Sequence, residues 1–118
     1  MQQTLEQIRA AHALEACANV QKKSVTKLPA MIVSNGLLAT AAFAKDKREG
    51  LLAAMDALSV HLRRTGKISE TPENLRQRDH TPNDDILNDL KGRDSSYLRL
   101  ATSETLAYLA FLKRFAKD

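Results

Sequence analysis

The sequence predicts an all-α fold: a compact bundle of five to six helices with no sheet, in a single domain over residues 1–118. The composition is 43% hydrophobic and 27% charged, with only four glycines and three prolines, which is typical of a globular helical protein. Apolar residues recur with helical spacing, and no segment shows the alternation of a half-buried strand. A chain of 118 residues can bury a core without disulfides or metal.

The first helix is expected over about residues 3–22, which contain neither Gly nor Pro and are rich in good helix formers. Its apolar residues are spread around the helix, which indicates contact with more than one neighbour. The run from Gln21 to Lys27 then carries three positive charges and no acid. This run is interpreted as a solvated connection, with phosphate contact as the alternative.

The second helix is expected over about residues 28–45 and is apolar nearly all round, which predicts a central position in the bundle. Pro29 fits its first turn, where a missing N–H costs nothing, and Thr26 is a candidate cap. Gly36 lies in the middle, where glycine costs about 1 kcal/mol relative to alanine. We expect close approach of another helix to compensate for this cost.

The third helix follows the joint at residues 45–50, with leucines at core-facing spacing, and ends at Gly66. Two Thr-Pro pairs, at Thr71 and Thr81, then combine a hydroxyl cap, a proline at the first helical position and an acid in the first turn. They predict short helices over residues 72–78 and 82–91. The acidic residues of the second one are expected from helix-start electrostatics and a solvated face; they are Asp84, Asp85 and Asp89.

The last helix is expected over residues 95–117, capped by Asp94 or Ser95, and it has two different faces. Its apolar face holds four of the five aromatic residues of the chain, so we expect it to supply the bulk of the core. The opposite face is a basic stripe. The aromatic residues are Tyr97, Tyr108, Phe111 and Phe115.

Charge and cysteine content limit the classes of function. The formal net charge of +4 permits a polyanionic partner without requiring one. Cys17 is the only cysteine, which excludes an intramolecular disulfide and a cysteine-based zinc site within one chain. The start of the chain lacks the pattern of a secretory signal, and Pro29 and Gly36 interrupt its longest apolar region. We therefore expect a cytoplasmic protein without a membrane partner.

The sequence offers no constellation for catalysis, and we expect no enzyme, no cofactor and no metal. The histidines His12, His61 and His80 fall in different segments, none with a second His or Cys at ligand spacing. Phosphate-binding glycine loops and nucleophile motifs are missing. Glu104 leans toward the aromatic face of the last helix, where burial would raise its pKa unless a cation or donor attends it. We interpret Glu104 as a buried glutamate bonded to a helix start or an arginine. The minor alternative is that the protein is a small hydrolase with Glu104 as its catalytic residue.

Three stretches resemble one known family. They are Thr-Leu-Glu-Gln-Ile-Arg-Ala-Ala at residues 4–11, Leu-Pro-Ala-Met-Ile-Val-Ser-Asn-Gly-Leu at residues 28–37, and the segment 94–117. That segment contains Ala-Thr-x-Glu followed by Leu-Lys-Arg-Phe-Ala, which is fairly specific in this order. Together the stretches are similar to the small, fifth subunit of the Cmr complex, the type III-B CRISPR effector that degrades RNA under guide-RNA direction. Residues 45–93 form the variable part.

The resemblance implies an all-helical subunit without catalytic activity. Several copies would stack along the effector, with the backbone subunit, the large subunit and further copies as protein partners, and would help to hold guide and target RNA. Phosphate contact through Lys and Arg, without base reading, fits such a role. The candidate RNA-binding residues are Arg99, Lys113, Arg114 and Lys117 on the last helix, then Lys22, Lys23 and Lys27 in the basic run.

A second hypothesis remains open from the sequence. The chain would be a helical interaction and assembly module with no direct RNA contact, and its basic residues would only keep it soluble. Charge reversal on the last helix separates the two hypotheses, because only the first predicts a loss of RNA binding.

Overall fold

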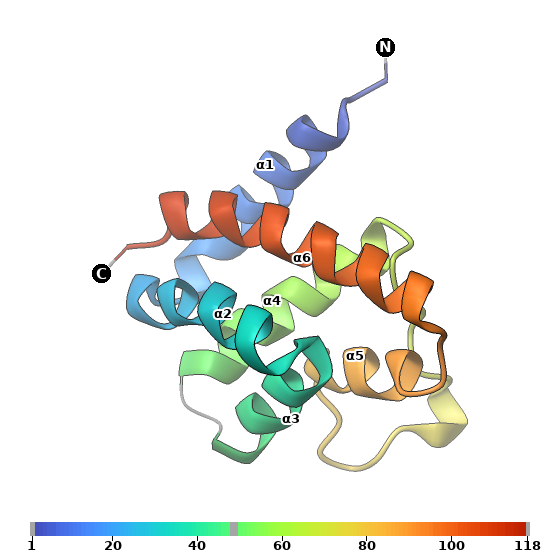
Figure 1. The fold of residues 1–118 in the computed structure, drawn as a ribbon. Coiled ribbons are helices and arrows are strands. Elements are labelled where there is room, and N and C mark those ends of the chain that lie inside the picture. Colours follow the sequence, from blue (N-terminus) through green and yellow to red (C-terminus); the bar gives the residue numbers. More distant parts are fainter. Residues whose placement is uncertain (1, 48–49, 118) are drawn as a thin grey trace.

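Six α-helices and two short 3-10 turns make up the computed structural model, which describes residues 2–47 and 50–117 (Figure 1). Within these residues the only β-type pairing is one isolated bridge. The all-α prediction is therefore confirmed. The elements are α1 (Leu5–Ala16), a 3-10 turn (Cys17–Asn19), α2 (Lys22–Asn35), α3 (Leu37–Lys47), α4 (Gly50–Arg64), a second 3-10 turn (Glu73–Leu75), α5 (Asn83–Leu90) and α6 (Ser95–Phe115).

The longest helix, α6, crosses the body of the molecule and packs against α1, α2 and α4 (Figure 1). Its apolar face lies in the core as the sequence predicts, with Tyr108 and Leu112 fully buried, while Phe111 and Phe115 are half-buried against the same cluster. The rest of the core comes from every other helix. Its largest buried side chains include Leu28 and Ile32 of α2, Leu37 of α3, Leu58 and Leu62 of α4, and Ile86 and Leu90 of α5.

The first predicted helix ends earlier than expected. Thr4 caps α1 through a capping box, in which its hydroxyl accepts from Gln7 N and its own N–H donates to the Gln7 side chain. The helix gives way to the 3-10 turn, and the chain then extends at Val20, with φ −128° and ψ 153°. Val20 is buried, so burial of an apolar side chain accompanies the change of direction.

The basic run is not a connection, because α2 begins at Lys22 and includes it. The predicted cap Thr26 instead lies inside α2, where its hydroxyl donates to the Lys22 carbonyl at 2.7 Å. Pro29 likewise lies inside the helix and not in its first turn. These predictions were wrong because the helix starts about two turns before the apolar stretch that marked it.

The predicted helix over residues 28–45 is divided at Gly36 into α2 and α3. Gly36 has φ 94° and ψ 158°, a region of backbone conformation that is open essentially only to glycine. A Cβ atom placed on Gly36 would meet nothing within 4 Å, so the expected close approach of a neighbouring helix is absent. Conformation, and not packing, explains this glycine.

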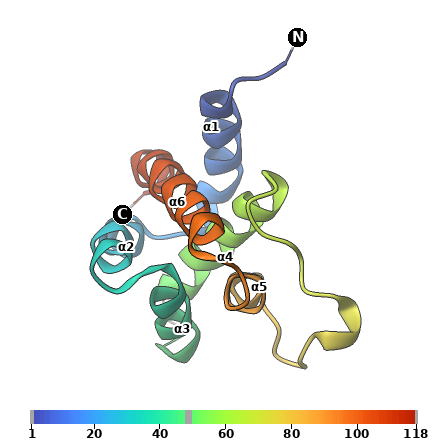
Figure 2. The same ribbon diagram turned by 45° about the vertical axis from the view of Figure 1, so that its right-hand side comes forward.

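The second half of the chain follows the prediction more closely. Gly66, with φ 74°, ends α4, and Lys67 N donates to the Leu62 carbonyl at 2.8 Å, as in a helix C-terminal motif. Asp94 caps α6 by accepting from Tyr97 N at 2.9 Å. The predicted helix over residues 72–78 is wrong: only the 3-10 turn forms there, within a loop that extends away from the helices (Figure 2).

Candidate functional site

Two groups of basic residues that are far apart in the sequence meet at one end of the molecule. Gln21 and Lys117 form the isolated parallel bridge, and Lys22 N donates to the Lys117 carbonyl at 3.2 Å. The start of α2 therefore lies beside the end of α6 (Figure 1). We call this surface the basic end. Its residues are Lys22, Lys23 and Lys27 from α2 and Lys113, Arg114 and Lys117 from the end of α6.

The charges of the basic end are open to solvent. All of its side chains are exposed except that of Lys22, which is half-buried. No carboxylate within residues 2–47 and 50–117 forms an ion pair with any of them. A surface pocket of about 780 Å³ lies here, with Lys23 and Lys117 among its lining residues. The basic end is therefore a positively charged surface with a pocket beside Lys23 and Lys117, and no carboxylate of residues 2–47 and 50–117 is paired with its cations.

The helix dipole explains the positions of the basic residues on α6 but not those on α2. Lys113 and Arg114 lie in the last turn of α6, where the helix dipole favours cations. Lys22 and Lys23 instead lie in the first turn of α2, which contains no acid, and there the dipole disfavours positive charge. The α2 lysines therefore raise the positive potential of the basic end at some cost to their own helix.

Arg99 does not belong to the basic end. It is exposed on α6, but the helical rise of about 1.5 Å per residue places it about 21 Å from Lys113 along the axis. The structure thus brings together six of the seven predicted RNA-binding residues and leaves Arg99 apart. Whether any of them contacts RNA stays a prediction.

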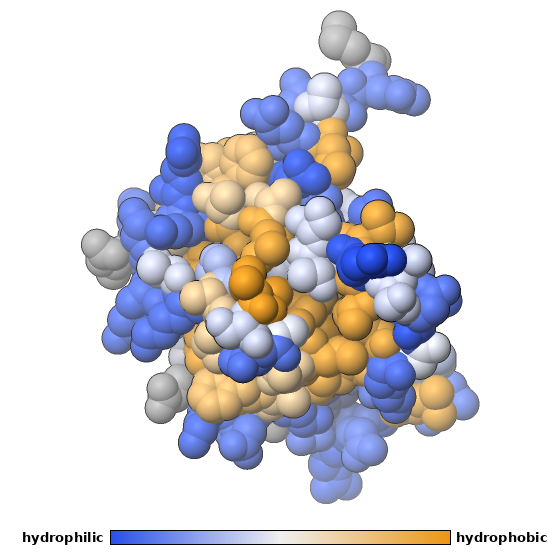
Figure 3. Space-filling view, viewed as in Figure 1, coloured by the Kyte–Doolittle hydropathy of each residue, from blue (hydrophilic) through white to orange (hydrophobic). Residues whose placement is uncertain are grey.

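The middle of the face formed by α2 and α6 is apolar. Figure 3 shows hydrophobic side chains gathered there, with hydrophilic side chains around them. Val33 of α2 and Leu100 of α6 are 73% and 62% exposed. Single exposed apolar residues are ordinary on a protein surface, whereas a gathered group indicates a contact surface.

A buried polar cluster, which sequence reasoning only partly anticipated, joins α1, α4 and α6. Arg9 donates to both oxygens of Glu104, from Nε at 2.8 Å and from Nη2 at 2.7 Å. His61 Nε2 lies 2.8 Å from Glu104 Oε2, and His61 Nδ1 lies 2.8 Å from His12 Nδ1. The prediction of a buried Glu104 bonded to an arginine is confirmed. Its partners lie in other helices, so no spacing in the sequence identifies them.

Burial and pairing act in opposite directions on these groups. Burial raises the pKa of Glu104, but bonds from Arg9 and His61 outweigh it and hold that pKa below its ordinary value. Burial lowers the pKa of His61 despite the nearby carboxylate. Burial, together with the positive charge of Arg64, also lowers the pKa of His12. The cluster therefore favours an ionised Glu104 and neutral histidines.

A cavity of about 410 Å³ lies between α1 and α4, beside this cluster. His12, Glu15, His61, Arg64 and Tyr108 are among its lining residues. Tyr108 stacks on His61 with ring centroids 4.1 Å apart. In the described part of the chain, no group of three or more His, Cys, Asp or Glu side chains is arranged to hold a metal ion.

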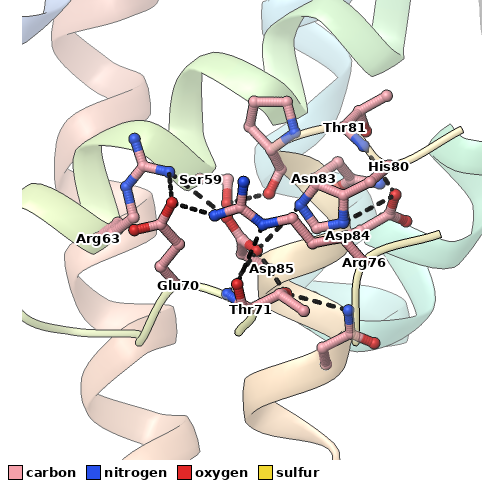
Figure 4. A network of polar contacts seen from close by, with 12 residues as sticks. Ser59, Arg63, Glu70, Thr71, Arg76, His80, Thr81, Asn83, Asp84 and Asp85 are labelled. Carbon is pink, nitrogen blue, oxygen red and sulfur yellow. Dashed lines mark hydrogen bonds and ion pairs between the residues drawn. The ribbon is translucent and has the colours of Figure 1, made fainter. Parts of the chain in front are cut away.

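The acidic residues at the start of α5 are structural, and two of them are not on a solvated face as predicted: Asp84 and Asp85 are buried. Asp84 accepts from Lys45 Nζ at 2.8 Å and from Thr81 N at 2.9 Å. Asp85 accepts from Thr71 N at 2.9 Å. Figure 4 shows the contacts of Asp85 with Thr71 and of Asp84 with Thr81, which fasten the long loop to the body of the protein.

No helix within residues 2–47 and 50–117 has the length and apolar character of a membrane span.

Comparison with known proteins identifies the family. Comparisons with curated proteins and with solved structures gave no match. The family model described as CRISPR-associated protein (Cas_Cmr5) matches residues 2–118. The chain therefore belongs to the Cmr5 family of CRISPR-associated proteins and is a component of a Cmr complex.

Proposed function

We propose that this protein is the non-catalytic small subunit of a type III-B Cmr ribonucleoprotein effector, acting in the cytoplasm in antiviral defence. Copies of it stack beside the backbone subunit and the large subunit, and the basic end contacts the phosphate backbone of guide and target RNA. Family membership supports the first part of the proposal. The observation that carries the second part is the meeting of two distant basic segments at the Gln21–Lys117 bridge.

The chemistry of the basic end suits phosphates better than bases. Flexible ammonium and guanidinium groups bind phosphate without reading sequence, and they release counterions when they do so. The aromatic rings nearest the end of α6, Phe111 and Phe115, pack on the core cluster, so they are not presented as a stacking platform for bases. We therefore expect weak RNA binding by the isolated protein and a stronger contribution within the assembled complex.

The state of Glu104 supports a non-catalytic role. Both of its oxygens are engaged by Arg9, and one of them also by His61. Its side chain is only 3% exposed. A general acid must reach a substrate proton directly or through one water, and this carboxylate is enclosed by its own partners.

The test is charge reversal within the reconstituted complex. The variant carries Lys113→Glu, Arg114→Glu and Lys117→Glu, and target-RNA affinity is measured over a range of salt concentrations. If these side chains contact phosphates, affinity falls and the slope of log affinity against log salt decreases by roughly 2 for three lost contacts to single-stranded RNA. An unchanged affinity and slope would contradict the RNA contact.

A matched control reverses three cations elsewhere on the surface: Lys67, Arg78 and Lys91. None of these side chains forms an ion pair with a residue in the described ranges 2–47 and 50–117, and the substitutions change the formal net charge by the same amount. The control distinguishes local contact from a general effect of net charge. Equal loss of affinity in both variants would also contradict the assignment to the basic end.

A second candidate function is an assembly module without RNA contact, which the exposure of Val33 and Leu100 favours. Under this hypothesis, Val33→Asp with Leu100→Asp abolishes incorporation into the complex, whereas the charge reversals leave RNA affinity unchanged. Co-purification of the other subunits with tagged variants measures incorporation directly. Loss of RNA affinity in correctly assembled charge-reversal complexes would exclude this alternative.

A further inference from the structure

The contact between His12 of α1 and His61 of α4 constrains where protons lie. An ionised carboxylate only accepts hydrogen bonds, so His61 Nε2, 2.8 Å from Glu104 Oε2, must carry a proton. In neutral His61 the other nitrogen, Nδ1, then holds a lone pair. His12 Nδ1, which lies 2.8 Å from it, must therefore be the donor. The neutral pair is held by one proton between two facing nitrogens.

Counting protons shows when this contact fails. A first added proton leaves the contact intact, because His61 as an imidazolium donates from Nδ1 and His12 then accepts. A second added proton places an N–H on both Nδ1 atoms. Two donors facing each other at 2.8 Å cannot form a hydrogen bond, and both rings then carry positive charge. The doubly protonated pair must separate.

We propose that the His12–His61 contact is a pH-sensitive switch between α1 and α4, closed while the pair holds at most one added proton and opened by the second. Opening widens the cavity of about 410 Å³ that both residues line. Separation of His12 from His61 leaves α1 packed on α6, because the Arg9–Glu104 ion pair that joins these helices does not involve the facing Nδ1 atoms.

The charged groups around the pair set the direction of its response. Arg9 of α1 and Arg64 of α4 oppose protonation, while Glu104 of α6 and Glu15 of α1 favour it. Asp56 of α4 and Tyr108 of α6 also line the cavity. Because burial lowers the pKa of both histidines, the open and unfolded states bind more protons than the closed state. Closing is therefore favoured at neutral pH and weakens as pH falls below about 6.5.

Nitrogen-15 NMR of the imidazoles in the full-length protein tests the proton assignment. At pH 7.5, the expected result is His61 protonated at Nε2 and His12 protonated at Nδ1, the rarer tautomer of free histidine. His80, outside the cluster, is the internal reference. Finding His12 protonated at Nε2 and His61 protonated at Nδ1 in the neutral pair would overturn the proposal.

Amide hydrogen exchange between pH 7.5 and 5, corrected for intrinsic rates, tests the switch. Protection of α1 amides facing α4 is expected to fall by at least about tenfold per pH unit below 6.5, because opening takes up the second proton and, where the closed pair is still neutral, the first as well. Protection in α5 should stay level. In His12→Gln the side-chain amide can donate to or accept from His61, so the pH dependence should become much weaker, whereas His80→Gln should behave as the wild type.

Either of two results in this experiment would contradict the proposal: a level α1 protection in the wild-type protein, or an undiminished pH dependence in His12→Gln. If His12→Gln fails to fold, the wild-type exchange and imidazole spectra decide the question by themselves. The outcome is independent of RNA binding, so it leaves the proposed function to its own test.

Discussion

Arg9 and Glu104 are separated by 95 positions in the sequence and form a two-bonded ion pair, with distances of 2.8 and 2.7 Å. The Glu104 side chain is 3% exposed and that of Arg9 is 22% exposed. The pair joins α1 to α6 at a place where the carboxylate has almost no access to bulk water. Its stability therefore depends on both partners being present, because a lone buried charge is costly.

Glu104→Gln tests this dependence. The substitution keeps the shape of the side chain but leaves the Arg9 charge without its partner, and the new amide cannot accept from both Arg9 and His61 in the same way. We expect a loss of about 2 to 3 kcal/mol in the free energy of unfolding at pH 7, at the lower end for a broken buried pair because Arg9 is partly solvated. Urea denaturation measures the change.

The matched control for this substitution is Glu15→Gln, which removes the exposed pair between Glu15 and Arg64. Exposed pairs contribute little to stability, so this variant should unfold close to the wild type. Equal losses in the free energy of unfolding for the two substitutions would show that burial does not make the Arg9–Glu104 pair more important for stability than an exposed pair.

Acid should destabilise the protein through its buried carboxylates. The pKa of Glu104 and that of Asp84 lie below their ordinary values of 4.5 and 3.8 despite burial, because Arg9 with His61 and Lys45 respectively bind the charged forms. The unfolded chain therefore binds protons at higher pH than the folded one. The stabilisation that ionised Glu104 and Asp84 contribute to the folded state is fully present above about pH 4.5. It is lost as the pH falls through the pKa values of these two groups in the folded protein.

Denaturant unfolding at a series of pH values from 6 to 2.5 measures this loss. Glu104→Gln should show a shallower decline, because one of the two titrating groups is gone. A decline identical to that of the wild type would mean that Glu104 does not contribute to acid sensitivity. The histidine effect is separable, since it begins about two pH units higher.

Gly36→Ala should destabilise the corner between α2 and α3. The space around Gly36 is open, so the cost arises from φ 94° alone, and we expect about 2 kcal/mol. Gly92→Ala is the control, because Gly92 has neither a positive φ nor any atom within 4 Å of an added Cβ. Thermal or urea unfolding measures both. A Gly36→Ala protein as stable as Gly92→Ala would refute the conformational explanation.

Asp85→Asn should loosen the loop between α4 and α5. Asp85 accepts from Thr71 N, and Arg63 and His80 lie 3.6 and 3.3 Å from its oxygens. Loss of this buried charge lowers the free energy of local opening by about 1 to 3 kcal/mol, so trypsin should cleave after Arg76 about 5- to 150-fold faster.

Limited proteolysis followed by mass spectrometry measures that rate. Glu73→Gln supplies the control, because the Glu73 carboxylate is exposed in the same loop and forms no ion pair with the residues that the structure describes. Equal cleavage rates in Asp85→Asn and the wild type would show that other contacts of the loop hold it in place.

The sequence predicted helix ends correctly where the end depends on bonds between residues that are close together in the chain. Asp94 and Gly66 mark helix ends through bonds to residues only a few positions away, and both predictions were right. The Thr71 signal failed because the Thr71 hydroxyl and N–H donate to Asp85 instead of serving a helix start. A cap residue and a loop anchor look alike in the sequence when the competing partner is fourteen positions away.

The candidate site was predictable in composition but not in arrangement. The basic residues of α2 and α6 were identified as charges, yet their meeting depends on the turn at Val20 and on the bridge to Lys117. Likewise, the projection of α6 indicated a buried Glu104, whereas Arg9 and His61 reach it through tertiary packing. Contacts of this kind follow from how helices pack, which no local pattern specifies.

The bridge at Gln21 and Lys117 has a consequence for how the basic end can change. Because Lys22 N donates to the Lys117 carbonyl, backbone groups hold the two segments together, and the lysine side chains take no part in that bond. Position and charge are therefore separate properties of this surface. Substitution of the charged side chains can adjust its affinity for a polyanion over a wide range while the scaffold beneath it keeps the same shape.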